Sequence, residues 1–184
     1  QALKNAVMKS IVEITETGGG KRDLIWNSNP EAGIEERFKA LVDKNLQVYI
    51  SDIDTKFSDV FEEVTIIYPK SFNIILDKTK IKLSSTDEIT ISDKDFNKES
   101  VYPTVQYSSK LIIEVETGFS LSVFGRIYNE FSKSNQCIEK SDIFRNIKCI
   151  DECIVEKNFL NYEILLDKVG FVVPIMKFKI PKQC

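Results

Sequence analysis

The chain has 184 residues, a formal net charge of −3 and no histidine. A weakly acidic chain lacks the basic footprint of a nucleic-acid-binding domain, so we expect no nucleic-acid partner. The lack of histidine excludes Ser-His-Asp triads, histidine general bases and histidine metal ligands. No apolar run approaches the ~20 residues of a transmembrane helix. The length predicts a single domain over residues 1–184.

The N-terminal segment predicts an amphipathic helix over residues 2–14. Leu3, Ala6, Val7, Ile11 and Ile14 recur at spacings of three and four, which places them on one stripe. The alternative is a strand over Ile11–Thr15, since this stretch is rich in β-branched residues and alternates.

A second helix is predicted over Pro30–Lys44. Asn29 suits the N-cap, Pro30 suits the first helical position, and Asn45 suits a left-handed cap after the last turn. The next segment, Asn45–Ile53, alternates apolar and polar residues and predicts the first strand.

Residues 62–127 predict a run of short antiparallel strands. Val64–Tyr68 and Ile89–Ile91 are two of them. Between these, Phe72, Ile74 and Leu76 predict a hairpin with Leu83, Ile81 and Thr79, turning at Asp77-Lys78.

The alternation is clearest over Lys110–Ile127, which predicts a second hairpin. A three-residue loop, Glu116-Thr117-Gly118, keeps both apolar sets on one face. It sets Val115 opposite Phe119, Ile113 opposite Leu121 and Leu111 opposite Val123.

The C-terminal third is more ambiguous. Ser141 is a candidate cap for a helix over Asp142–Val155, but the β-branched content makes a strand an almost equal alternative. Tyr162, Ile164 and Leu166 predict a strand facing Ile175, Val173 and Phe171 across a loop with Gly170. Pro174 indicates an edge position or a bulge.

These elements define the expected fold class, α+β. We expect a predominantly antiparallel sheet of about eight to ten short strands, with one or two N-terminal helices packed on one face. A two-sheet sandwich is an alternative arrangement of the same strands.

The four cysteines indicate the redox environment in which the protein functions. Cys137, Cys149, Cys153 and Cys184 favour two disulfides in an exported protein, with free thiols or a four-thiolate zinc site as alternatives. Cys149 and Cys153 share a face in helix or strand, so each should bond a distant partner, and one of them is expected to reach Cys184. We therefore expect an extracytoplasmic location: secreted, periplasmic or envelope-associated.

The polar stretch 93–103 predicts an exposed loop. A solvated loop is the simpler interpretation, and binding of a protein partner is the alternative, because loops often carry function. The candidate partner-binding residues are Asp93, Lys94, Asp95, Phe96, Lys98, Glu99 and Tyr102.

No motif predicts an enzyme, and we expect neither a cofactor nor a catalytic residue nor a metal ligand. The GGGKR stretch lacks the spacing of a phosphate-binding loop. The acidic pairs Glu35-Glu36, Glu62-Glu63 and Asp151-Glu152 lie in stretches that read as exposed, whereas acid–base catalysis needs carboxylates in different environments.

The sequence therefore favours an exported, disulfide-stabilised, non-enzymatic module that binds a macromolecular partner through its sheet edges or the 93–103 loop. A carrier for an apolar, lipid-like ligand is the first alternative, because twelve phenylalanines and a helix-on-sheet layout suit an apolar cavity. A hydrolase that uses carboxylates alone is the second.

Overall fold

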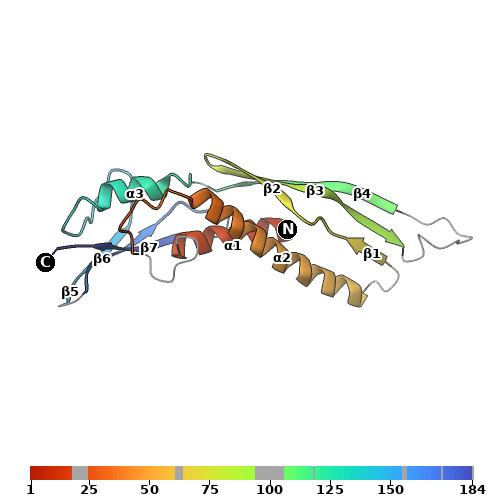
Figure 1. Ribbon diagram of the computed structural model, residues 1–184, viewed down its shortest axis with the longest axis horizontal. Helices are drawn as coiled ribbons and strands as arrows, with labels where there is room; N and C mark the ends of the chain where they lie inside the picture. The colour runs from red at the N-terminus through yellow and green to blue at the C-terminus, as the bar shows by residue number, and fades with distance from the viewer. Residues whose placement is uncertain are drawn as a thin grey trace, which may run out of the picture.

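The computed structural model describes residues 1–17, 25–60, 64–93, 106–117, 119–154, 157–170 and 172–183 (Figure 1). Over these residues the chain forms three helices and two antiparallel sheets, with seven strands, which confirms the α+β class. Figure 1 shows an elongated molecule with one sheet toward each end and the helices α1 and α2 crossing between them.

Helix α1 spans Ala2–Thr17, as the apolar stripe predicts. Ala6, Val7, Ile11 and Ile14 are all buried, so the stripe faces the core. The strand alternative for Ile11–Thr15 is wrong, because the same β-branched residues also fit the helical spacing and pack inward from a helix.

Helix α2 spans Ile34–Val60 and differs from the prediction at both ends. At its start, the Asn29 side chain accepts a hydrogen bond from the Glu31 backbone N–H (3.0 Å), but this closes a turn before the helix. Gly33 has a φ of 72° there, a left-handed conformation that glycine adopts without strain. The helix therefore begins four residues after Pro30.

The predicted strand Asn45–Ile53 is wrong, because α2 continues through it. Leu46, Tyr49 and Ile53 keep the three-to-four spacing of the first half of the helix, and all three lie on the side of α2 that faces the first sheet. Val48, an apolar member of the alternating pattern, is 53% exposed. Asn45 does not cap the helix but lies buried in its middle.

The first sheet contains β1 (Val64–Ile67), β2 (Phe72–Asp77), β3 (Lys80–Asp93) and β4 (Gln106–Glu116). β1 and β2 pair with successive parts of β3 along one of its edges, and β4 pairs along the other. The predicted separate strand Ile89–Ile91 is the second half of β3. A register shift between Ser84 and Glu88 separates the two halves, as a β-bulge does.

The β2–β3 hairpin forms as predicted but two residues out of the expected register. Leu76 lies opposite Ile81 and Ile74 opposite Leu83, with Lys78 and Thr79 in the turn. Lys78 adopts a positive φ of 26°, which supplies the turn geometry without a glycine. The shift is even, so the apolar residues keep their predicted face.

The predicted hairpin Lys110–Ile127 is wrong in its second half. β4 pairs with β3, so Val115 lies opposite Ile81 and not opposite Phe119. The residues from Val123 to Phe131 form helix α3, in which Phe124, Ile127 and Phe131 are buried at helical spacing. Gly118 lies outside the described residues.

The second sheet has the order β5 (Ile147–Ile154), β6 (Lys157–Leu165) and β7 (Ile175–Pro181). The helix predicted over Asp142–Val155 is wrong and the strand alternative is correct. Ser141 Oγ accepts hydrogen bonds from the N–H groups of Ile143 and Phe144, so it stabilises a turn before β5.

The β6–β7 hairpin is confirmed, but its register is not. Tyr162 lies opposite Phe178, and Ile164 lies opposite Met176. Pro174 precedes β7 and accepts a hydrogen bond from Leu166 N–H through its carbonyl (2.9 Å). The strand therefore begins after the proline, and Met176, Phe178 and Ile180 form its buried face.

The densest part of the core lies where α1, α3 and the second sheet meet. Trp26 stacks on Phe178 with ring centroids 4.1 Å apart, and Phe178 stacks on Tyr162 at 5.1 Å. Phe131 meets the Tyr162 ring edge-on at 4.7 Å. This aromatic cluster anchors one end of the molecule, whereas packing between α2 and the first sheet is looser.

Candidate functional site

The second half of α2 faces the inner surface of the first sheet across an apolar groove. The helix contributes residues at spacings of three and four, and the sheet contributes alternate residues of its strands. The groove is lined by Gln1 and Leu3 from the N-terminus, by Leu46, Tyr49, Ile50, Ile53 and Phe57 from α2, and by Ile66, Tyr68, Pro69, Phe72, Ile89, Ile91 and Leu111 from the sheet region.

The groove has a volume of about 250 Å³ and its walls are incompletely packed. Leu46 and Pro69 are its buried wall residues, and most of the others are half-buried. Phe57 is 43% exposed and Ile91 is 37% exposed. Two apolar surfaces thus face one another without closing, which is the arrangement of many small-molecule sites.

The side chains that line the groove include no charged group. The one buried polar atom without a partner there is the hydroxyl of Tyr68, which forms no hydrogen bond with the described residues. Burial raises the pKa of Tyr68, and the nearby carboxylate of Asp54 raises it further. The phenol is therefore held in its protonated form, which can donate a hydrogen bond.

Two other pockets are polar. One, of about 330 Å³, lies between the start of α2, the β2–β3 turn and the segment before α3, and includes Glu31, Glu35, Glu36 and Asp77. All four carboxylates are exposed. Carboxylates in the same solvated environment do not provide the separate acid and base that hydrolysis needs.

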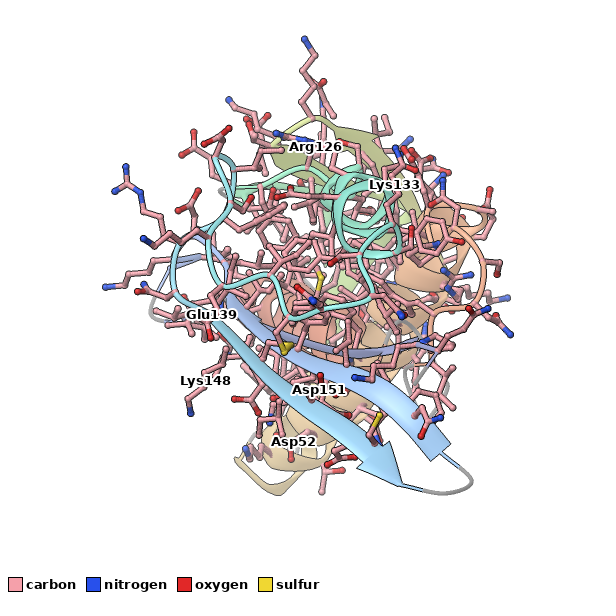
Figure 2. The ribbon with its side chains drawn as sticks, turned by 90° about the vertical axis from the view of Figure 1, so that its left-hand side faces the viewer. Asp52, Arg126, Lys133, Glu139, Lys148 and Asp151 are labelled. Carbon is pink, nitrogen blue, oxygen red and sulfur yellow. A yellow bond between two sulfur atoms is a disulfide. The ribbon has the colours of Figure 1, made fainter. Side chains whose placement is uncertain are left out.

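The third pocket, of about 460 Å³, lies between α3 and the loops beside the second sheet. It brings together Arg126, Arg145 and Asp167. Arg126 and Arg145 are both exposed. The end view in Figure 2 shows Arg126 on the outer surface of the molecule.

The predicted acidic pairs are not brought together. Glu35 and Glu36 lie in the first turn of α2, where they are exposed to solvent and favourably placed near the helix N-terminus. Asp151 lies on β5 and forms an ion pair with Lys182. The pair Glu62-Glu63 lies outside the described residues.

Cys137 and Cys149 form a disulfide with Cα atoms 5.7 Å apart. The bond ties the segment after α3 to β5, on the side of the molecule seen in Figure 2. It excludes the four-thiolate zinc site, because bonded sulfurs are not thiolate ligands. Cys153 is also disulfide-bonded. Its partner, and the expected bond to Cys184, lie outside the described residues.

The predicted partner-binding loop is largely outside the described residues. Asp93 ends β3, and Lys94, Asp95, Phe96, Lys98, Glu99 and Tyr102 all fall in the range that is not described. The sequence therefore pointed to a loop, whereas the candidate site in the described residues is the groove. The helical spacing of Leu46, Tyr49 and Ile53 was the signal that could have revealed one wall.

Within the described part of the chain, no group of three acidic or cysteine side chains could hold a metal ion. None of the described helices has the length and apolar character to cross a membrane. No family model matches the chain, and no curated protein or solved structure is significantly similar to it. Function must therefore be inferred from the geometry of the groove.

Proposed function

We propose that this chain is an exported, non-enzymatic binding protein that takes up an uncharged ligand with a hydrocarbon chain in the groove between α2 and the first sheet. The observation that carries the proposal is the unfilled apolar groove of about 250 Å³. The disulfide between Cys137 and Cys149 supports an oxidising compartment.

The size of the groove limits the ligand. Its volume corresponds to roughly eight water molecules at about 30 Å³ each, which limits the ligand to one short hydrocarbon chain or a similarly small apolar group. Burial of such a chain against Ile53, Phe72 and Leu111 provides the binding free energy, at about 25 cal/mol for each Å² of apolar surface removed from water.

The charges limit the head group. No lysine or arginine lines the groove, so no side chain there would neutralise a buried carboxylate or phosphate. The carboxylate of Asp54 acts on Tyr68 and would repel an anion beside it. An alcohol or ester oxygen could instead accept a hydrogen bond from the Tyr68 hydroxyl. That hydroxyl is covered in the unfilled groove, so binding would include a rotation of the Tyr68 side chain toward the ligand.

The proposal is tested by native mass spectrometry of protein purified from lipid-rich cells, together with titration of the uncharged fluorophore N-phenyl-1-naphthylamine. A co-purifying apolar molecule and saturable fluorophore binding support it. Ile53→Glu should weaken fluorophore binding by about tenfold or more, because it places a charge in the apolar wall. Val48→Glu, on the exposed side of the same helix, is the matched control and should bind normally.

The absence of both a bound molecule and saturable binding would exclude the proposal. Equal losses in Ile53→Glu and Val48→Glu would also count against it, since they would show that the fluorophore does not occupy the groove.

A further inference from the structure

The edge strand β4 is the second feature that points to function. Ten of its 11 residues pair with β3 along one edge, and no other described strand pairs with it. Figure 1 shows β4 at the border of the first sheet, on the side away from α2. A long edge strand presents unpaired backbone N–H and C=O groups, which form a template for another strand.

The direction of these backbone groups can be assigned. The Leu111 N–H donates to Ser85 Oγ on β3 (3.0 Å), so the backbone of Leu111 points toward β3. Successive residues of a strand point their backbone groups to opposite edges. Lys110, Ile112 and Glu114 therefore direct their backbone groups to the open edge.

We propose that two copies of the chain associate through β4, in an antiparallel pair centred on Ile112, to form one continuous sheet. A two-fold axis at Ile112 places Lys110 of each copy opposite Glu114 of the other. The same axis sets Ile112 opposite its own counterpart and Leu111 opposite Ile113. The central cross-strand pairs, from residue 110 to residue 114, are thus of matching chemistry on both faces.

The neighbouring registers are less favourable. Residues directly opposite each other in the β4–β4 pair must lie on the same face of the sheet, so the two-fold axis can move only from one residue to the next. An axis at Ile113 places Ile112 opposite Glu114, and an axis at Leu111 places Lys110 opposite Ile112. Both oppose a charge to an apolar side chain, so the register centred on Ile112 is the preferred one.

The charges needed for this register are present. Lys110 lies opposite Glu88 on β3, but the Glu88 carboxylate accepts a hydrogen bond from the Ser108 hydroxyl, and Lys110 forms no ion pair with a described residue. Glu114 contacts Lys80 at 2.9 Å, and this hydrogen bond and charge lower the pKa of Glu114. The carboxylate therefore stays ionised and can contact a second cation.

Ile112 provides the apolar contact at the axis. Its side chain is 61% exposed on the outer face of the sheet, although it is flanked by Lys110 and Glu114 two residues away. Pairing of the two copies would cover this side chain with its own counterpart. The contact area is that of a strand pair, so we expect a reversible dimer of micromolar affinity rather than an obligate one.

Charge-reversal variants test the register. Lys110→Glu creates two Glu–Glu oppositions in the dimer, and Glu114→Lys creates two Lys–Lys oppositions, so each should weaken self-association about tenfold. An equimolar mixture of the two variants restores an opposite charge at both positions of a heterodimer. Analytical ultracentrifugation should find each variant largely monomeric and the mixture as dimeric as the wild type.

Cross-linking tests the axis itself. Ile112→Cys should yield a disulfide-linked dimer under mild oxidation, because the two introduced thiols face one another. Ile67→Cys on β1, where the isoleucine is 58% exposed, is the matched control and should stay uncross-linked. A monomeric wild type at high micromolar concentration, a mixture no more dimeric than its components, or equal cross-linking of both cysteine variants would overturn the proposal.

Discussion

Asn45 of α2 donates a hydrogen bond of 3.0 Å to the hydroxyl oxygen of Ser10 on α1, and both residues are fully buried. The Ser10 hydroxyl in turn donates to the Ala6 carbonyl at 2.7 Å. The two helices are thus joined by a polar chain inside an apolar interface. Because an unsatisfied buried polar group is costly, this contact fixes how α1 and α2 are aligned along each other.

Ser10→Ala should therefore destabilise the protein by about 1–3 kcal/mol, because it leaves the Asn45 amide buried without its acceptor. Urea unfolding followed by circular dichroism measures the change. Ser51→Ala, an exposed serine on α2, is the control and should change stability by less than about 0.5 kcal/mol. Equal stabilities of Ser10→Ala and the wild type would show that water or a rearranged side chain replaces the bond.

The head-group preference of the groove can be measured by displacement of N-phenyl-1-naphthylamine. Dodecanol should displace the fluorophore at concentrations about tenfold lower than dodecanoate at pH 8, since the lining offers a carboxylate no cationic side chain. Tyr68→Phe should reduce the preference several-fold by removing the hydroxyl donor. Tyr107→Phe, a 57% exposed tyrosine that does not line the groove, should leave it intact.

If dodecanoate competes as well as dodecanol does, the head group is not selected by charge. The groove would then remain a binding site, but the proposal that its ligand is uncharged would be wrong. Asp54→Asn offers an independent check, because removal of this carboxylate should strengthen dodecanoate binding and leave dodecanol binding unchanged.

The disulfide between Cys137 and Cys149 closes a short loop, with a sequence separation of 12. Cys137→Ser/Cys149→Ser should lower the free energy of unfolding by about 2–4 kcal/mol, mainly because the unfolded chain regains freedom. Thermal unfolding with and without reductant measures the effect. The melting temperature of the double variant should respond less to reductant than that of the wild type, and an identical response would contradict the prediction.

Gly125 in α3 lies directly against the Glu31 side chain. A Cβ atom at this position would come within 2.8 Å of Glu31 Cδ and 3.0 Å of Glu31 Cβ, so the glutamate must move. Gly125→Ala alone should therefore be neutral or destabilising. Glu31→Ala/Gly125→Ala removes the contact with Cδ and keeps only the 3.0 Å contact with the Cβ atom of residue 31, so the double variant should be more stable than Gly125→Ala in the glutamate background, by up to about 1 kcal/mol, since alanine is the better helix former.

The coupling between these positions is the measured quantity. Glu31→Ala alone completes the double-mutant cycle by differential scanning calorimetry. Additive effects of the two substitutions would show that the Glu31 side chain moves aside at no cost.

Some of the fold follows directly from local sequence. The stripe from Leu3 to Ile14 forms α1 as predicted, with Ala6, Val7, Ile11 and Ile14 in the core and Leu3 partly buried beside it. The alternation on either side of Asp77 places Ile74 and Leu83 opposite each other on the inner face of a hairpin, and the faces are right although the register is shifted by two. These elements were predicted correctly because a single period accounts for most of their apolar residues.

Other elements were decided by tertiary packing. The residues around Leu46, and those from Phe119 to Ile127, contain apolar positions that fit a period of two and also a period near 3.6, so the pattern alone could not select one. In the structure, Phe124, Ile127 and Phe131 are buried at helical spacing in α3. Phe131 packs against Tyr162 and Phe178, which come from strands far along the chain. The pairing of β4 with β3 leaves no strand role for Phe119.

The sequence by itself predicted the fold class and the buried faces of β2, β3 and β4, and it favoured disulfides for the cysteines. The tertiary structure decided which ambiguous segments are helices, where the groove opens and which strand edge is left unpaired. The physical reason is that a groove and a free edge arise between distant segments: Ile53 and Leu111 form one site only because α2 crosses the inner face of the first sheet.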